Sequence, residues 1–226
     1  IHRRQGSVSG ETMYKKLDEA TIYNLLETGI HEFAEHGFDQ ANVNRIAKDA
    51  GLSVGVIYKY YDGKEGFFLA CVRHSLKLLD EAMADAMSDE DDFMGNVRRV
   101  LFFLIENARK HPDYYLLYHE ITAGGCKKFA TTLAGEIETL SSNVYSNLIE
   151  RARDAGNVRA DMDCHAFAFF FDNLLMMLQF SYCCDYYKER MRIYCGGKIP
   201  ADDHVVEEML KFTYGALKVK NIKETP

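Results

Sequence analysis

The sequence lacks tryptophan and has few of the residues that interrupt regular structure, with 3 prolines and 16 glycines in 226 residues. These low counts exclude a collagen-like repeat and a low-complexity chain rich in proline and glycine. The hydrophobic share of 47% and the charged share of 27% are those of an ordinary globular protein. The length suits one large domain, or a small domain joined to a larger one.

The sequence also lacks an excess of positive charge, since its formal net charge is −7. This balance argues against a protein that binds nucleic acid all over its surface through diffuse positive charge. This net charge is still compatible with a local basic patch.

Signs of a disulfide framework or a metal site are missing as well. None of the six cysteines lies in a C-x-x-C pair, and no apolar secretory segment opens the printed sequence. The pairs Cys164-His165 and Cys183-Cys184 lack zinc-ligand spacing, because adjacent residues on a helix point about 100° apart. We therefore expect buried thiols in a reducing cytoplasm, no metal and no cofactor.

Period-two alternation is absent, whereas apolar residues recur throughout at steps of three and four, which predicts an all-α fold. The residues from Ser88 to Asp92 form an acidic run that we interpret as a solvated connection. Gly37 is placed to end the first helix. The predicted helices span residues 16–36, 43–50, 54–60, 64–87, 93–110, 112–122, 127–155, 163–187 and 201–220.

The segment from Cys164 to Cys184 is apolar enough to raise the question of a membrane span. Asp172 argues against one, since a mid-span aspartate costs roughly 2.5–3.5 kcal/mol on insertion scales. A helix that is apolar nearly all round is instead buried both by its own domain and by a partner. We therefore expect no membrane, and a homodimer formed through residues 163–187 and 201–220.

One short motif suggests an enzyme. Gly51-Leu52-Ser53-Val54-Gly55 matches the G-x-S-x-G nucleophile elbow of hydrolases, which requires a buried strand before the serine. The preceding residues, Ile46-Ala47-Lys48-Asp49-Ala50, are charged helix formers and provide no strand. We do not expect an enzyme.

The strongest pattern extends over about fifty residues and consists of many spaced positions that agree at once. It reads Gly37-Phe38, then Val43-x-x-Ile46-Ala47-x-x-Ala50-Gly51-Leu52-Ser53-x-Gly55-x-Ile57-Tyr58-x-Tyr60-Tyr61-x-x-Lys64-Glu65-x-Phe67. This pattern resembles the N-terminal DNA-binding region of the TetR family of bacterial repressors. The resemblance implies a helix-turn-helix domain over residues 15–62 and a helical effector-binding and dimerisation domain over residues 63–226. It also implies a cytoplasmic homodimer that binds a palindromic operator in double-stranded DNA and is released by a small-molecule effector.

The residues themselves support a helix-turn-helix. We expect Ile46, Ala47 and Ile57 to form a small core between the two short helices and the first helix. The second short helix then protrudes, and the major groove of DNA is wide enough to admit it. Residues 42–64 carry four Lys or Arg and two Asp, so this face is locally basic. The DNA contacts implied by the resemblance are Asn42, Arg45, Ser53, Val54, Val56, Tyr58, Lys59, Tyr60 and Lys64.

The middle helices contain more aromatic residues than the packing of one helix against another needs. This excess predicts an apolar effector pocket of roughly 300 Å³ or more. The predicted ligand contacts are Phe102, Phe103, Tyr114, Tyr115, Tyr118, Phe170 and Met177. Two alternatives remain open: a helical DNA-organising or scaffold protein without an effector, and an enzyme that uses an apolar helical cavity for its substrate.

Overall fold

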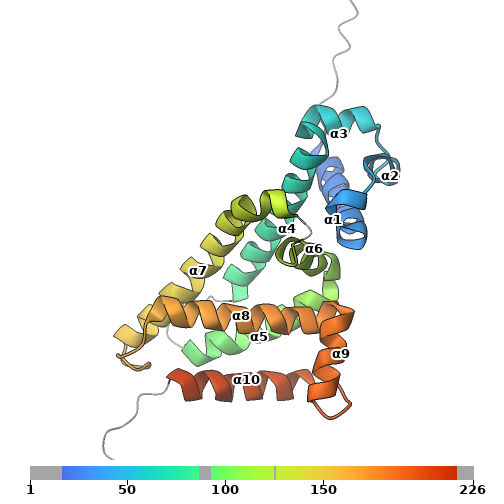
Figure 1. Ribbon diagram of the computed structural model, residues 1–226. Coiled ribbons are helices and arrows are strands. Elements are labelled where there is room, and N and C mark those ends of the chain that lie inside the picture. The colour runs from blue at the N-terminus through green and yellow to red at the C-terminus, as the bar shows by residue number, and fades with distance from the viewer. Residues whose placement is uncertain (1–16, 87–92, 125, 218–226) are drawn as a thin grey trace, which may run out of the picture.

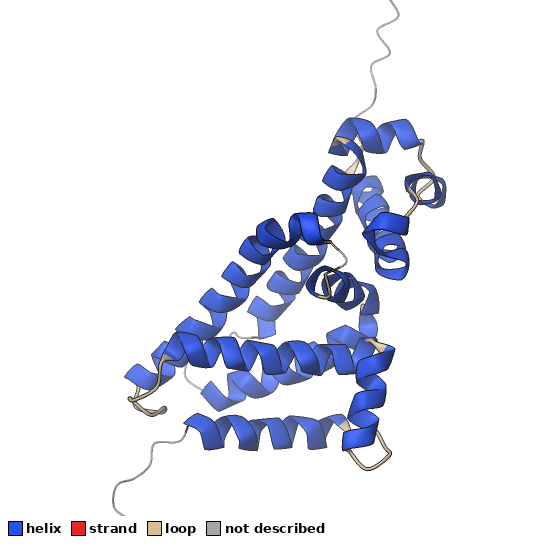
Figure 2. Ribbon diagram, in the orientation of Figure 1, coloured by secondary structure: helices blue, strands red, loops and turns tan. Residues whose placement is uncertain are grey.

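The computed structural model describes residues 17–86, 93–124 and 126–217, and Figure 2 shows helices and loops but no strand in them. The all-α prediction is therefore confirmed for this part of the chain. The elements are α1 (Glu19–Gln40), α2 (Val43–Asp49), α3 (Val54–Tyr61), α4 (Gly63–Ala86), α5 (Phe93–Lys110), α6 (Pro112–Thr122), the 3₁₀ turn η1 (Lys127–Phe129), α7 (Ala130–Asp154), α8 (Cys164–Cys183), α9 (Asp185–Tyr194) and α10 (Asp202–Leu217).

The helices form a small head and a larger body (Figure 1). Helices α1, α2 and α3 make up the head, and α4 runs from it into the body, in contact with α1, α3, α5 and α6. In the body, α5 packs against both α8 and α10, and α7 packs along α8. Helix α6 lies between head and body, in contact with α1 on one side and α8 on the other.

The ends of α1 follow from its sequence. Asp18 caps the first turn by accepting a hydrogen bond from the Thr21 amide at 2.7 Å, so the helix begins at Glu19, later than expected. Gly37 adopts φ +69°, a left-handed conformation that glycine adopts without strain, and it kinks the helix before a last turn that reaches Gln40.

The prediction of one helix over residues 163–187 is wrong. Cys184 is extended (φ −97°, ψ 128°) and separates α8 from α9, although neither proline nor glycine marks the break. The turn lets Tyr187 pack back on Phe180, with ring centroids 5.5 Å apart, and both rings contact His119 of α6. A tertiary contact, not local propensity, therefore ends α8.

The other helix boundaries agree with the prediction to within a few residues. The last helix ends at Leu217 within the described residues, and the helix expected over 127–155 starts with the 3₁₀ turn η1. The acidic run from Ser88 to Asp92 lies outside the described residues, as do residues 218–220.

The head and the body share one aromatic cluster. Phe33 and Phe38 of α1 meet Phe68 of α4 edge-on, each at a centroid distance of 5.0 Å, and Phe129 of η1 packs on Phe38 at 5.3 Å. Helix α1 approaches α4 very closely at Gly29, where an added Cβ would lie 2.6 Å from the Phe67 ring and 2.7 Å from Cys71 Sγ. The contact therefore requires a glycine.

Helix α8 is long and apolar enough to cross a membrane by length and composition alone, and 39% of that stretch is buried inside the protein. Its buried side packs on α5 and α7. Its other side carries Phe169 and Phe170, which are both largely exposed, as is Phe212 of α10.

We expect Gly29→Ala to lower the free energy of unfolding by roughly 1–3 kcal/mol, because the new methyl group overpacks the contact with Phe67 and Cys71. The matched control is Gly135→Ala on α7, where an added Cβ meets nothing within 4 Å. This control should be neutral or stabilising by up to about 1 kcal/mol. Urea denaturation of both variants is the measurement. Equal stability of the two would contradict a close α1–α4 contact.

Candidate DNA-binding surface and interior cavity

Helices α2 and α3 are held to α1 by a small buried core. Ile46, Ala47 and Ile57 are almost fully buried, as predicted, and Leu52 is half-buried against them. Asn42 caps α2 by accepting a hydrogen bond from the Asn44 amide at 2.9 Å. The Leu52 amide bonds the Ala47 carbonyl at 2.8 Å, which closes the tight turn between the two helices.

Helix α3 presents its polar side outward. Tyr58 is 52% exposed, Lys59 and Ser53 are exposed, and no side-chain hydrogen bond from Ser53 caps the helix. Val56 is half-buried. Val54, another predicted DNA contact, is also half-buried and packs against the core.

Arg45 is engaged within the protein. Its Nε lies 3.1 Å from Oε2 of Glu32, a residue of α1 that is only 5% exposed, and its guanidinium also contacts His36 at 3.0 Å. The other Glu32 oxygen accepts the Asn42 amide at 2.7 Å. The charge of Arg45, which makes residues 42–64 look basic, is therefore balanced by a carboxylate outside that stretch.

Two further predicted DNA contacts also have partners inside the protein. Lys64 Nζ donates to the Asp39 carbonyl at 3.0 Å and lies 5.1 Å from the centre of the Phe38 ring, so it fastens α4 to the end of α1. The Tyr60 hydroxyl accepts the Leu17 amide at 3.0 Å. Of the predicted set, Ser53 at the N-cap of α3 is exposed, as are Tyr58, Lys59 and Tyr60 on the helix itself. Their contact with DNA stays a prediction.

The body contains a partly open cavity of about 100 Å³ between α4, α5, α6, α7 and α8. Of the seven predicted ligand contacts, Phe103, Tyr114, Tyr115 and Tyr118 line it. The cavity is smaller than the roughly 300 Å³ we expected, because four tyrosine side chains, those three and Tyr145, occupy its walls.

The other three predicted contacts lie elsewhere. Phe170 is 62% exposed on the outer side of α8, so its prediction as a ligand contact is wrong. Phe102 and Met177 are half-buried in the packing between helices and are not among the residues that line the cavity. On both helices the neighbouring residue lines the cavity instead: Phe103 next to Phe102 on α5, and Met176 next to Met177 on α8.

Three carboxylates give the cavity its electrostatic character. Asp172 of α8 and Asp80 of α4 line it, and Glu138 of α7 accepts a hydrogen bond from the Tyr118 hydroxyl at 3.3 Å. Burial, together with the charge of Glu138, raises the pKa of Asp172 to about 6. Burial also raises the pKa of Tyr118 and Tyr145, so both phenols are neutral. No Lys, Arg or His side chain is among the described residues that line this cavity.

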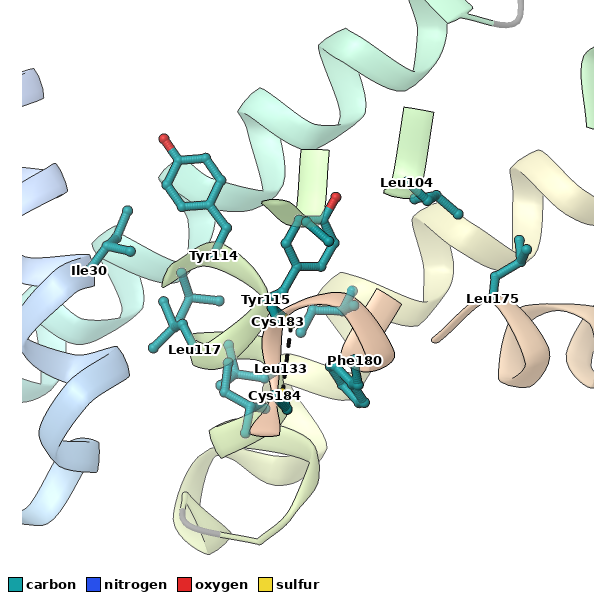
Figure 3. Close-up of a cluster of buried hydrophobic side chains, with 14 of the residues drawn as sticks. Ile30, Leu104, Tyr114, Tyr115, Leu117, Leu133, Leu175, Phe180, Cys183 and Cys184 are labelled. Carbon is teal, nitrogen blue, oxygen red and sulfur yellow. Dashed lines mark hydrogen bonds between the residues drawn. The ribbon is translucent and has the colours of Figure 1, made fainter. Parts of the chain in front are cut away.

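Helix α6 connects the cavity with α1. Figure 3 shows Tyr114 leaving α6 toward the side where Ile30 of α1 lies, while Tyr115 leaves it toward Leu104 of α5. The Tyr114 hydroxyl donates to Oε1 of Glu27 on α1 at 2.7 Å, and the same oxygen contacts His74 Nε2 of α4 at 3.0 Å. Tyr114 therefore belongs both to the cavity wall and to the contact between head and body.

Two more contacts tie α6 to α1. Asp113 Oδ2 lies 2.8 Å from His31 Nδ1, and this hydrogen bond raises the pKa of His31. At the far end, Glu120 approaches the kink of α1 so closely that a Cβ on Gly37 would lie 2.8 Å from its Oε1.

Sequence reasoning missed several of these residues. Glu32 lies three residues after Gly29 on the apolar face of α1, and an acid at such a position is a signal of a buried ion pair. Asp172 is the only acid in the apolar segment 164–183, where it counted only against a membrane span. Nothing in the sequence indicates that Glu27, His74 and Tyr114 meet, because they come from three helices.

Comparison with known proteins agrees with this geometry. Residues 25–71 match the family model described as "Bacterial regulatory proteins, tetR family". The HTH-type transcriptional repressor SCO4008 of Streptomyces coelicolor is 36% identical over 95 residues, which cover 42% of this chain and 46% of that protein. The nucleoid occlusion factor SlmA of Haemophilus influenzae is 28% identical over 102 residues, covering 43% of this chain and 47% of that protein. These matches span about half the length of the relatives.

Solved structures also share the fold of most of the chain. The transcriptional regulator FadR of Bacillus subtilis, solved in complex with stearoyl-CoA, superposes with a TM-score of 0.65 at 13% identity, covering 87% of this chain and 100% of that one. At this identity the likeness concerns the fold alone. Residues 25–71 therefore resemble the N-terminal region of the tetR family of bacterial regulatory proteins, and the helical architecture is shared with solved regulators.

Proposed function

We propose that the protein is a ligand-responsive transcriptional repressor of the bacterial cytoplasm, which binds operator DNA as a homodimer and leaves it when a small molecule enters the cavity. It is a regulator and not an enzyme. The observation that carries the proposal is that α6 lines the cavity with one side and holds α1 with the other. A ligand that shifts α6 therefore shifts the helix on which α2 and α3 rest.

The coupling needs a ligand that binds one arrangement of α6 better than another, because equal affinity for both would shift nothing. Tyr114 supplies such a difference. Its ring forms part of the cavity wall while its hydroxyl bonds Glu27, so a ligand that displaces the ring breaks a hydrogen bond to α1. The name of the repressor SCO4008 supports repression as the direction of control.

The dimer rests on the outer side of α8 and α10. Phe169, Phe170 and Phe212 are each more than 60% exposed, and Leu174 and Phe212 line one common hollow. Contiguous exposed apolar surface of this kind marks an interface. Two copies that pair through this side form a four-helix bundle and place two copies of α3 on one face of the DNA.

A DNA-organising function without an effector is the second candidate, because the chain resembles SlmA, whose name is that of a nucleoid occlusion factor. An operator selected from random duplexes distinguishes the two. A repressor selects one palindrome and releases it with a small molecule, whereas the organising protein binds its DNA regardless of any ligand.

We expect Arg45→Ala and Lys59→Ala to weaken DNA binding for different reasons. Loss of Arg45 leaves the buried Glu32 carboxylate short of a partner, which lowers the free energy of unfolding by roughly 1–3 kcal/mol. Loss of the exposed Lys59 leaves stability within about 0.5 kcal/mol but reduces the salt dependence of DNA affinity by about one unit per lost phosphate contact. Thermal melts and DNA titrations at several salt concentrations give both quantities. An unchanged salt dependence in Lys59→Ala would show that Lys59 does not contact the backbone.

Light scattering at micromolar concentration should give a dimer for the native chain and a monomer for Phe170→Glu, because the new charge is desolvated in the interface. Tyr23→Glu is the matched control, since Tyr23 is also exposed but lies on α1 in the head. A native monomer would remove the two-half-site arrangement. A dimer in Phe170→Glu would place the interface elsewhere.

Tyr114→Phe should loosen α1. It removes one hydrogen bond to a carboxylate, worth roughly 1 kcal/mol, so amide exchange in α1 speeds up about fivefold. Tyr118→Phe makes the same chemical change on the same helix but removes a bond to Glu138 of α7, so exchange in α1 should stay as in the native protein. Hydrogen exchange followed by mass spectrometry measures both. Equal effects of the two variants would argue against coupling through Tyr114.

A further inference from the structure

The cavity that the proposed function assigns to an effector has an unusual charge balance. Two acids line it, Asp80 at its exposed edge and Asp172 deeper inside, and Glu138 lies beside Asp172. No Lys, Arg or His among the described side chains forms an ion pair with any of the three. Three carboxylates thus gather at one cavity with no cation to balance them.

Asp172 bears most of the cost of this arrangement. It is half-buried on α8, and removal from water together with the neighbouring Glu138 raises its pKa to about 6. At neutral pH most molecules therefore carry a partly buried carboxylate that has no partner of opposite charge. Such a charge attracts a cation strongly, since the surroundings screen it less than bulk water would.

Tyr145 is a further polar group in the cavity wall. Its side chain is 3% exposed and lines the cavity, yet its hydroxyl has no hydrogen-bond partner among the described residues. The charges of Asp172 and Glu138 both act on this phenol, so it lies close to the carboxylates. Among the described residues, the buried side-chain atoms that lack a partner are those of Tyr182 and Thr213, so the Tyr145 hydroxyl is not sealed in the core and is open to the cavity that its side chain lines, where a bound molecule can contact it.

The walls of the cavity are aromatic and suit a cation that carries apolar groups. Tyr114, Tyr115, Tyr118, Tyr145 and Phe103 bring five aromatic rings to one cavity. The face of an aromatic ring attracts a cation within about 6 Å, most strongly where water is excluded. A volume of about 100 Å³ favours a compact molecule.

We infer that the effector is a compact organic cation with apolar substituents, an aryl or alkyl amine or quaternary ammonium compound, whose charge is placed between Asp172 and the tyrosine rings. Only the statement that the bound molecule is an effector rests on the proposed function, and the binding site itself does not depend on that function. It excludes free carboxylates and acyl thioesters of coenzyme A, whose negative charge would meet the three acids.

The test uses two probes of the same shape. Phenyltrimethylammonium and tert-butylbenzene differ only by a charged nitrogen in place of a carbon, and benzoate serves as an anionic probe. Titration calorimetry on the 226-residue protein without DNA, at pH 7.5, should show the cation binding at least tenfold more tightly than the neutral probe, and benzoate more weakly still. Equal affinity of the cation and tert-butylbenzene, tighter binding of benzoate, or no binding of the cation at millimolar concentration would each overturn the inference.

Variants identify the site. Asp172→Asn keeps the shape of the side chain and should weaken cation binding at least tenfold while leaving tert-butylbenzene unaffected. Glu106→Gln removes the same charge from the exposed surface of α5 and should bind the cation as the native protein does. Without ligand, Asp172→Asn should melt at the same or a higher temperature, because it removes an unpaired buried charge; a lower melting temperature would mean that the carboxylate has a structural partner instead.

A separate measurement keeps this inference apart from the proposed function. Operator release is followed by fluorescence anisotropy of a labelled duplex while each probe is added. A cation that binds the free protein but leaves the operator complex intact would support the site and contradict ligand-responsive repression. Release by benzoate or tert-butylbenzene, with no effect of the cation, would support the repressor and contradict the cationic effector.

Discussion

The contact between α1 and α4 is the constraint on which the rest of the structure depends. The two helices approach so closely at Gly29 that the Phe67 ring and the Cys71 thiol occupy the space of a side chain. Phe33, Phe38 and Phe68 extend the contact into an aromatic cluster that reaches η1. Because interiors are close-packed and deform little, the head cannot turn independently of the first half of α4. Contacts with α4, α6 and η1 therefore tie the head to the body.

The buried carboxylates of the head and of the body differ in whether they have a partner. In the head, the buried Glu32 carboxylate is fully used, since it pairs with Arg45 and accepts the Asn42 amide. This network fixes the angle of α2 and leaves less positive charge for DNA than the sequence suggests. In the body, Asp172 has no such partner. The buried carboxylate of the head is thus satisfied within the protein, whereas Asp172 pairs with no Lys, Arg or His among the described residues.

The position of α6 joins these two features. Its tyrosines line the cavity on one side, while Asp113, Tyr114 and Glu120 reach α1 on the other. Some of these contacts depend on hydrogen bonds between half-exposed groups, which cost far less to break than the aromatic cluster. The structure thus combines a rigid contact between α1 and α4 with a weaker one between α1 and α6.

The sequence by itself determined the helical class, most helix boundaries, the small core of the head and the side of α3 that faces outward. Those features follow from local periodicity, capping residues and glycine, which act over a few residues. It also determined that α8 carries more apolar surface than its own domain covers. The tertiary structure alone decided that Cys184 ends α8, that Phe170 faces outward while Met176 lines the cavity, and that Arg45 meets Glu32. Each of these depends on the rotation of one helix against another, and side chains distant in sequence, not local propensity, set that rotation.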